Sequence, residues 1–282
     1  MQLKNAVIVV TGGGSGIGAA LCERFAADAP RSITVADLDL PGAERVAAGI
    51  VATHPGVAVH AVQVDVSVES EVIALIAATT DRDGIIDLFC GNAGIGTAAG
   101  IEAPDEVWRR ITDVNVMAHV YAGRALLPGW LDRGRGHLMI TASAAGLLTN
   151  LGDAPYTVTK HGAVALAEWL SITYGDRGIS VSCLCPQGVR TPLLFPEMRT
   201  GTGGLGSGDS RSDDKPLALE VVKGQRVIEA SDVAAMVVPA LEDGRFLILP
   251  HEEVAAYEQA RTNDRERWMS AMRRMQATIT GG

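Results

Sequence analysis

The stretch Thr11-Gly12-Gly13-Gly14-Ser15-Gly16-Ile17-Gly18 decides the fold of this chain. It follows a short apolar run at residues 6–10 and precedes an Ala- and Leu-rich stretch with a helical pattern. Glycines let the backbone turn sharply and let a pyrophosphate approach closely, while the next helix presents unpaired N–H groups and the positive end of its dipole to the anion. Strand, glycine-rich turn and helix in this order predict a dinucleotide site, although a tight turn without a ligand is the alternative. A Walker loop is excluded because no Gly-Lys-Ser/Thr closes the run. The expected pyrophosphate contacts are Gly12, Gly14, Ser15, Gly16, Ile17 and Gly18.

Short β-branched runs alternate with Ala-rich helical stretches along the rest of the chain. Expected strands cover residues 6–11, 32–36, 57–64, 86–90, 136–142, 180–185 and 245–249. Expected helices cover residues 16–28, 41–53, 69–80, 105–132, 154–176 and 231–242. Most of the strands are apolar throughout, which is typical of strands covered by helices on both faces. The pattern predicts an α/β fold, a doubly wound parallel sheet of about seven strands in one Rossmann-type domain spanning residues 1–282.

Two segments depart from this rhythm. Residues 201–214 are rich in Gly, Ser and Asp and carry almost no core-forming side chains, so we expect a mobile substrate lid at about residues 192–225. Residues 252–277 have a helical pattern with Trp268, Met272 and Met275 on one stripe. We expect this C-terminal helical extension to pack its stripe on the core or on a second subunit.

Composition excludes several classes of function. The 282 residues carry a net charge of −9, whereas a protein that follows nucleic-acid phosphates needs a basic face. No apolar run reaches the length of a membrane span, and residues 6–10 are too few for a signal-peptide core. The cysteines form no CxxC pair and, with the scattered histidines, no zinc pattern. We therefore expect a cytoplasmic protein with no nucleic-acid partner, no membrane partner and no metal site.

The second expected strand ends in Val35-Ala36-Asp37, about 20 residues past the glycines. An acidic side chain at this place accepts hydrogen bonds from the adenosine ribose hydroxyls and repels a 2′-phosphate. Neither Ser15 nor Leu38, which we expect beside the ribose, offers a compensating positive charge. The sequence thus predicts NAD in preference to NADP. The alternative is that Asp37 begins a loop or caps the helix near Pro41.

Tyr156 and Lys160 form the candidate acid–base pair. Their i, i+4 spacing places both side chains on one helical face. A phenol is a poor base at neutral pH, and a nearby ammonium favours the phenolate and lowers its pKa. Ser143 follows an expected strand and is placed to reach the same substrate oxygen.

With these elements in hand, the sequence resembles the short-chain dehydrogenase/reductase superfamily over nearly the whole chain, to about residue 250. The matching motifs occur in the family's order along the chain. They are the TGxxxGxG turn at Thr11–Gly18, Asp65-Val66, Asn92-Ala93-Gly94, Asn115, Ser143, the YxxxK pair Tyr156/Lys160, and the run from Pro186 to Thr191.

The resemblance implies a role for each matched position. Tyr156 would exchange a proton with the substrate oxygen while a hydride moves to or from the nicotinamide, and Ser143 would orient that oxygen. Lys160 would lower the tyrosine pKa and bind the nicotinamide ribose, and Asn115 would hold a water of the proton relay. The remaining implied cofactor contacts are Asp65 and Val66 at the adenine, Asn92, Ala93 and Gly94 at the adenosine side, and Pro186, Gln187, Gly188, Val189 and Thr191 at the nicotinamide.

The chain departs from the family's pattern at two positions. Gly91 stands where the family has asparagine, so a side chain that ties neighbouring strands together is missing. Gln187 stands where the family has glycine, beside the nicotinamide. We expect Gln187 to contact the substrate or the nicotinamide.

The expected substrate pocket is mostly apolar. Its lining is drawn from Ala144, Ala145, Leu147, Leu148, Leu193, Leu194, Phe195 and Met198, together with Ser143, Tyr156 and Gln187. This lining favours a hydrophobic secondary alcohol or ketone, although Arg190 and Arg199 lie nearby. Two other functions stay open: an epimerase or dehydratase of the same fold, and a non-catalytic NAD-binding sensor or scaffold. The resemblance also implies a homo-dimer or homo-tetramer built through helices such as 105–132 and 154–176.

Overall fold

The β-branched runs form seven strands of one sheet in the order β3-β2-β1-β4-β5-β6-β9. Every pairing within this sheet is parallel. The strands are β1 (Val7–Thr11), β2 (Ser32–Asp37), β3 (Ala58–Gln63), β4 (Leu88–Gly91), β5 (Gly136–Thr141), β6 (Ile179–Leu184) and β9 (Leu247–Ile248). The computed structural model describes residues 1–198 and 226–280. The predicted doubly wound parallel α/β sheet in a single domain is confirmed.

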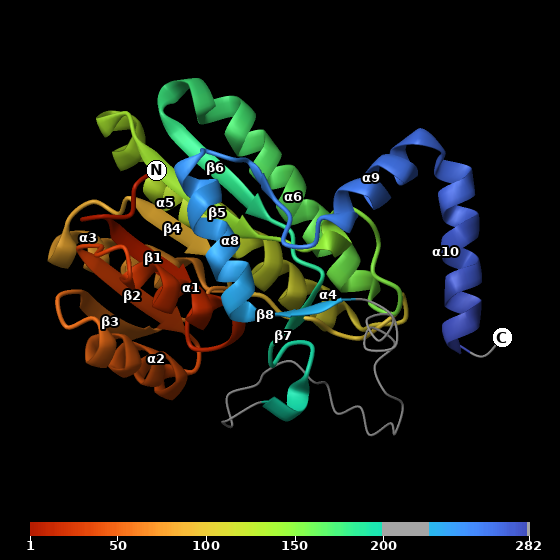
Figure 1. Cartoon of the computed structure of the whole chain (residues 1–282), viewed down its shortest axis with the longest axis horizontal. Coiled ribbons are helices and arrows are strands. Elements are labelled where there is room, and N and C mark those ends of the chain that lie inside the picture. Colours follow the sequence, from red (N-terminus) through yellow and green to blue (C-terminus); the bar gives the residue numbers. More distant parts are fainter. Residues whose placement is uncertain (199–225, 281–282) are drawn as a thin grey trace.

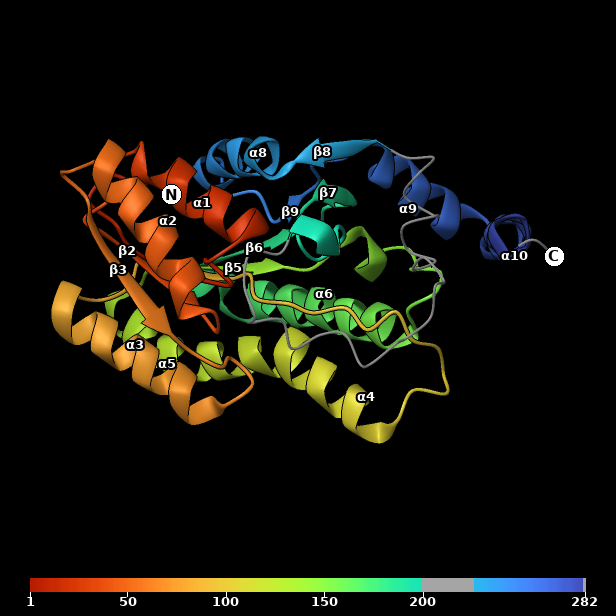
Figure 2. The same ribbon diagram turned by 90° about the horizontal axis from the view of Figure 1, so that it is seen from below.

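Helices cover both faces of this sheet (Figure 2). One face carries α1 (Gly16–Ala26), α2 (Leu40–Thr53) and α8 (Ala230–Glu242). The other carries α3 (Glu69–Asp83), α5 (Ala118–Arg133) and α6 (Ala154–Tyr174). Two large clusters of buried apolar residues fill the spaces between the sheet and these helices. All five residues of β1 are buried, as expected for a strand covered on both sides.

The order of the strands places a binding crevice beside β1. This strand pairs with β2 on one side and with β4 on the other. Strands β1 to β3 are therefore added toward one edge of the sheet and β4 onward toward the other, so the strand order reverses at β1. Ligands of open parallel sheets bind at such a switch point, beyond the carboxyl ends of the strands. The glycine-rich turn follows β1 directly and therefore lies at this edge.

Two predicted helices are interrupted in the structure. The helix expected at residues 105–132 is α4 (Asp105–Thr112), a π-helical turn at Asp113–Met117 and then α5. The extension expected as one helix at residues 252–277 is two, α9 (Glu253–Asn263) and α10 (Arg265–Thr280). The break occurs because Asp264 accepts the Arg267 N–H at 2.9 Å and caps a new helix.

The C-terminal helices lie at one end of the molecule, and α10 stands off from the sheet (Figure 1). Trp268 packs against the core cluster on the α6 side of the sheet, and its ring centroid lies 6.5 Å from that of Tyr257. Met272 and Met275 are half-buried, whereas Met269 beside the stripe is exposed. The predicted stripe is therefore anchored on the core at Trp268.

A second, two-stranded parallel sheet was not predicted. It joins β7 (Gly188–Arg190) to β8 (Val227–Glu229), and three residues are too few for a strand pattern to show in the sequence. Most of the lid expected at residues 192–225 lies outside the described residues, and its described beginning holds a 3-10 turn at Pro196–Met198. Within the described part of the chain, no helix is long and apolar enough to cross a membrane, and no group of His, Cys, Asp and Glu is arranged to hold a metal ion.

Candidate active site

The glycine-rich turn has the backbone that a phosphate cradle needs. Gly12 has a φ of +63°, in the left-handed region that favours glycine. A Cβ on Gly18 would collide with the Gly12 carbonyl oxygen, so the turn and the first turn of α1 approach each other as only glycine allows. Ser15 precedes α1 and makes no side-chain capping hydrogen bond, and the first turn of the helix carries no acidic residue. The N-terminus of α1 therefore suits an anion.

Asp37 lies beside this turn at the carboxyl end of β2. Its Oδ2 accepts the Gly14 N–H at 2.9 Å, and its Oδ1 accepts the Asp39 N–H at 2.9 Å. The carboxylate thus orders both the phosphate turn and the loop that begins α2, and its side chain stays partly exposed. The Leu38 carbonyl accepts the Gln63 side-chain amide at 3.2 Å.

Asp65 is held by residues of the protein itself. Its carboxylate accepts the backbone and hydroxyl of Ser67 at 3.0 and 2.6 Å and pairs with Arg110 at 3.2 Å. Burial opposes ionisation, but the Ser67 and Arg110 hydrogen bonds outweigh it and lower the pKa of the Asp65 carboxyl. Val66 is buried in the core cluster. These contacts place Asp65 in the turn before α3, with its oxygens shared among several donors.

Asn92 ties the end of β4 to the glycine-rich turn. Its side-chain amide donates to the carbonyls of Thr11 and Gly12 at 3.1 and 3.3 Å. The Thr11 hydroxyl in turn accepts the Asn92 and Ala93 N–H groups at 3.0 and 3.2 Å. Asn92 therefore fixes the glycine-rich turn to the end of β4.

The side chain missing at Gly91 is replaced from another element. A Cβ on Gly91 would lie 2.5 Å from Nδ1 of His119, which extends from α5 into the space that an asparagine would take. His119 is 2% exposed, and its Nε2 has no hydrogen-bond partner among the described residues. Burial, reinforced by the nearby Lys160 charge, lowers the pKa of His119 to about 3, so the ring is neutral. The loss at Gly91 is visible in the sequence, whereas its replacement by His119 from another element is not.

Asn115 lies in the π-helical turn, a type of turn that is frequent at functional sites. Its side chain accepts the Ile95 N–H and donates to the Ile95 carbonyl, both at 2.9 Å, and donates to Thr159 on α6 at 3.2 Å. The buried amide thus fixes the loop after β4 against α6. A Cβ on Gly94 in that loop would lie 3.2 Å from Lys160 Nζ and 3.3 Å from Asn115 Oδ1.

Ser143, Tyr156 and Lys160 converge at the carboxyl ends of β5 and β6. Lys160 is 3% exposed and donates to the Thr141 carbonyl at 2.9 Å. Its Nζ lies 5.6 Å from the centroid of the Tyr156 ring. The Ser143 hydroxyl accepts the Ala145 N–H at 3.1 Å and donates to the Pro186 carbonyl at 3.4 Å. The structure therefore brings the three predicted residues together.

The proton affinities of this group differ from the expectation. Burial raises the pKa of Tyr156 to about 12, although a hydrogen bond from Ser143 lowers it in part. Burial lowers the pKa of Lys160 to about 8. The predicted lowering of the tyrosine pKa by Lys160 is therefore not found here, because the surrounding protein favours the neutral form of both groups.

Asp153 is a site residue that the sequence analysis missed. It caps α6 by accepting the Tyr156 N–H at 3.0 Å. The same carboxylate accepts the Thr97 N–H at 2.7 Å, the Thr97 hydroxyl at 2.6 Å and the Ala98 N–H at 2.8 Å. This buried cap fixes the backbone of Tyr156 against the loop after β4. The signal was an Asp three residues before Tyr156, which is a helix-capping pattern.

Residues 186–191, which include the short strand β7 and are named here loop 186–191, face the glycine-rich turn. A Cβ on Gly16 would lie 3.1 Å from the Thr191 side chain, so the two segments are in contact. Val189 is buried in the core. Gln187 is partly buried, and its Oε1 is buried without a hydrogen-bond partner among the described residues. An amide oxygen left in this state is costly unless a ligand satisfies it.

The predicted substrate-pocket residues divide into two groups. Ala144, Leu147 and Leu148 are buried in the core cluster, and Ala145 is 9% exposed. Leu193 is 49% exposed, and Leu194 and Phe195 are half-buried. A Cβ on Gly96 would lie 3.8 Å from the Tyr156 ring and 3.9 Å from Leu193, which places Leu193 on the tyrosine side of the site.

Arg190 is engaged by other side chains of the chain. Its guanidinium pairs with Glu229 at 2.9 Å and lies 5.2 Å from the centroid of the Phe195 ring. Arg199 lies outside the described residues.

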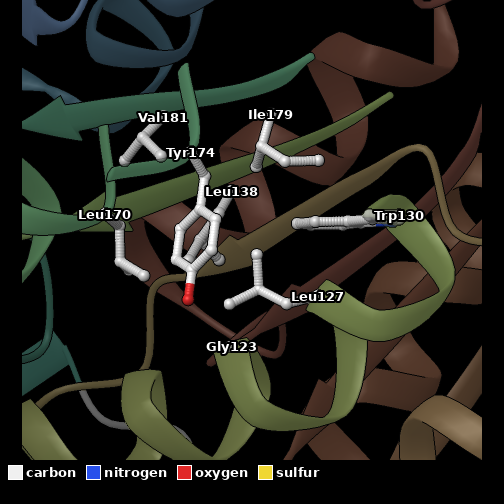
Figure 3. A pocket seen from close by; sticks show the side chains of 8 residues that line it. All are labelled: Gly123, Leu127, Trp130, Leu138, Leu170, Tyr174, Ile179 and Val181. Atoms are coloured by element: carbon white, nitrogen blue, oxygen red, sulfur yellow. The ribbon is translucent and has the colours of Figure 1, made fainter. Parts of the chain in front are cut away.

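A separate apolar pocket lies between α5, α6, β5 and β6 (Figure 3). Its lining includes Gly123, Leu127, Trp130, Leu170 and Tyr174. Tyr174 ends α6, whereas Tyr156 lies in its first turn, so this pocket is at the opposite end of the helix from the candidate site.

Comparison with known proteins found matches over most of the chain. A family model described as short chain dehydrogenase matches residues 6–200. The 1-deoxy-11-beta-hydroxypentalenate dehydrogenase of Streptomyces exfoliatus is 36% identical over 258 residues, covering 90% of this chain and 86% of that protein. The levodione reductase of Leifsonia aquatica is 30% identical over 247 residues, covering 86% of this chain and 89% of that protein. A solved short chain dehydrogenase/reductase from Burkholderia phymatum, in complex with NAD, matches with a TM-score of 0.82 at 29% identity, covering 94% of this chain and 96% of that one.

Proposed function

The chain belongs to the short-chain dehydrogenase family, an oxidoreductase family, and on that premise we propose that it is an NAD-dependent enzyme acting on a hydrophobic secondary alcohol or ketone. The observation that carries the proposal is the convergence of Ser143, Tyr156 and Lys160 beside the glycine-rich turn, at one edge of the sheet. The relatives named above are a dehydrogenase and a reductase, and both names fit this class of reaction.

The residues present fit a dinucleotide. The glycine-rich turn offers the cradle, and the uncapped N-terminus of α1 offers N–H groups for a pyrophosphate. Asp37 supports the choice of NAD, because its carboxylate would repel a 2′-phosphate while accepting ribose hydroxyls. Lys160 would hold the nicotinamide ribose. The unpartnered Gln187 Oε1 would accept the carboxamide or a polar group of the substrate.

When bound, NAD supplies the group that accepts or donates the hydride, and side chains of this protein donate or accept the proton. Tyr156 is protonated at neutral pH, which suits proton donation to the oxygen of a ketone. Ser143 is oriented by the Ala145 N–H and hydrogen bonds the same oxygen. We expect the Lys160 ammonium, whose Nζ lies 5.6 Å from the centroid of the Tyr156 ring, to favour the phenolate once the proton has left, while burial keeps the pKa of the resting Tyr156 raised. Asn115 holds the loop after β4, and Gly94 of that loop lies beside Lys160 Nζ.

The substrate class follows from what surrounds the tyrosine. Ala145, Leu193 and Leu194 are apolar, and Arg190 is occupied by Glu229 and Phe195. Apart from Lys160, which we assign to the nicotinamide ribose, no cation among the described pocket residues is therefore left for a carboxylate or phosphate. A hydrophobic alcohol or ketone satisfies such a site.

An oligomer is part of the proposal. The outward face of α6 exposes Val158, Trp169 and Ile172 at 58%, 56% and 84%. Apolar residues aligned on one helix face mark a surface that another subunit covers. We expect a homo-dimer or homo-tetramer, which the molar mass from light scattering will show; a monomer at micromolar concentration would refute this part.

The experiment is to follow NADH absorbance with a panel of hydrophobic secondary alcohols and ketones. We expect Tyr156→Phe to lower kcat by about a hundredfold to ten-thousandfold, the usual contribution of a general acid. Tyr174→Phe is the matched control, because it removes a hydroxyl from the far end of the same helix. NADP should be a much poorer cofactor than NAD, and Asp37→Ser should narrow the difference. NAD binding without turnover of any compound would favour a sensor or scaffold instead.

A further inference from the structure

The inference concerns His251, which follows β9 and lies before α9. Its side chain is 0% exposed, in contact with loop 186–191 and with the residue that precedes β8. Nothing in its sequence context, Leu-Pro-His-Glu, suggested a role in the site.

Both nitrogens of His251 have a partner. Nδ1 lies 3.2 Å from the Gln187 backbone N, and Nε2 lies 3.1 Å from the Arg226 carbonyl oxygen. A backbone N–H only donates and a carbonyl only accepts, so Nδ1 is the acceptor and Nε2 carries the proton. The ring is therefore held as the neutral Nε2–H tautomer. By contrast, His119 and His137 each leave one ring nitrogen without a partner among the described residues.

The peptide unit between Pro186 and Gln187 is held at both ends. Its carbonyl accepts the Ser143 hydroxyl at 3.4 Å and the Ala144 N–H at 2.8 Å, while its N–H donates to His251. A peptide unit is planar, so fixing the N–H end also fixes the direction of the carbonyl. His251 thus acts on the same rigid unit that contacts the catalytic serine.

We propose that His251 is a positioning residue that sets the orientation of loop 186–191 for the nicotinamide half of the cofactor. The inference rests on the proposed function, because it assumes that this loop faces the nicotinamide. The hydrogen bond from the Gln187 N–H to His251 orients the loop directly. The hydrogen bond to the Arg226 carbonyl holds the imidazole ring in place, and it connects the start of β8 to loop 186–191 through His251.

The two bonds of His251 can be removed one at a time. In His251→Asn, Oδ1 takes the place of Nδ1 and accepts the Gln187 N–H, while the Arg226 bond is lost. In His251→Gln, Nε2 reaches the Arg226 carbonyl, while the Gln187 bond is lost. The pair is matched in polarity, so a difference between the two variants reports on which bond matters.

The readout is the Kd for NAD compared with the Kd for ADP-ribose, which lacks the nicotinamide, both by calorimetry. We expect His251→Gln to weaken NAD by about tenfold, the effect of one lost buried hydrogen bond, and to leave ADP-ribose within about twofold. His251→Asn should keep NAD within about threefold of the wild type. Equal weakening of NAD in both variants, or equal weakening of NAD and ADP-ribose, would overturn the inference. A wild-type protein that binds ADP-ribose but gains nothing from the nicotinamide would also overturn it, and one that binds neither ligand would overturn the proposed function itself.

Discussion

The end of β4 and loop 186–191 each carry one departure from the family's usual sequence, and the structure absorbs them in opposite ways. At Gly91 a side chain is lost, and the His119 ring fills the space. At Gln187 a side chain is gained, and its Oε1 is left buried without a partner among the described residues. The first change is compensated inside the fold, whereas the second leaves a polar atom that a ligand can satisfy. A substitution is a better guide to binding when the protein around it leaves it unsatisfied.

The largest expected effect is that of Gly91→Asn at the end of β4. Because its Cβ would lie 2.5 Å from His119 Nδ1, we expect the free energy of unfolding to fall by roughly 3 kcal/mol, the upper range for overpacking. His119→Val in the same chain makes room, and we expect the double variant to recover more than about 1 kcal/mol of that loss. Urea unfolding of the single and double variants measures both values. Strictly additive effects would show that the two positions do not share one space.

The pH dependence of stability tests the burial of Lys160, which lies on α6 beside the loop after β4. Its pKa in the folded protein is about 8, against 10.5 in an unfolded chain, so the unfolded chain binds more protons between these values. The free energy of unfolding should therefore rise with pH in that window, by roughly 2 kcal/mol between pH 8 and pH 10. Tyr156 has the opposite sign, because its raised pKa contributes stability that is lost only above pH 10, its ordinary value.

Lys160→Met isolates this effect. The difference in unfolding free energy between wild type and variant should depend on pH in the window, while all other groups titrate in both proteins. A difference that is constant from pH 8 to pH 10 would show that the ammonium is well solvated.

The smallest expected effect is that of a substitution at Gln187, in loop 186–191. Gln187→Gly should raise the KM for NAD or for substrate by about threefold to tenfold, the effect of one hydrogen bond. Stability should change by less than about 1 kcal/mol, which is the usual range for a change to glycine in a loop. Gln187→Met is the control, because it keeps the length of the side chain without the amide. If glycine and methionine both leave kcat and the two KM values unchanged, Gln187 contacts neither ligand.

The sequence was sufficient to predict most of the fold. Seven largely apolar runs became the seven strands of the sheet, because strands covered on both faces are mostly apolar; the edge strand β3, which has no buried residue, is the exception. The pair β7 and β8 was not predictable, because each strand has only three residues and its partner lies far along the chain. The π-helical turn around Asn115 keeps a helical pattern of side chains and so is not visible in the sequence. Asp264 is a helix-capping residue, so the break between α9 and α10 was visible in the sequence, although one helix was predicted there.

Motif residues of the candidate site were predictable because they form local patterns. Ser143, Tyr156 and Lys160 and the glycines were all placed at one edge of the sheet, as expected. Two histidines near them were missed because their partners are remote, whereas Asp153 was missed although its helix-capping signal is local. His119 fills the space at Gly91, and His251 contacts Gln187 and Arg226. The raised pKa of Tyr156 was also missed, because it depends on how much protein surrounds the hydroxyl.

The position of β9 has a consequence for biosynthesis. This two-residue strand pairs with β6, and Ile248 accepts the Cys185 N–H at 2.9 Å three residues before His251. The ribosome synthesises a chain from its N-terminus onward, and a domain folds as a unit. The glycine-rich turn, Tyr156 and Lys160 are therefore translated well before the residues that hold loop 186–191. A nascent chain in which residue 251 is not yet synthesised contains the chemical groups of the site but lacks the hydrogen bonds of His251 to Gln187 and Arg226.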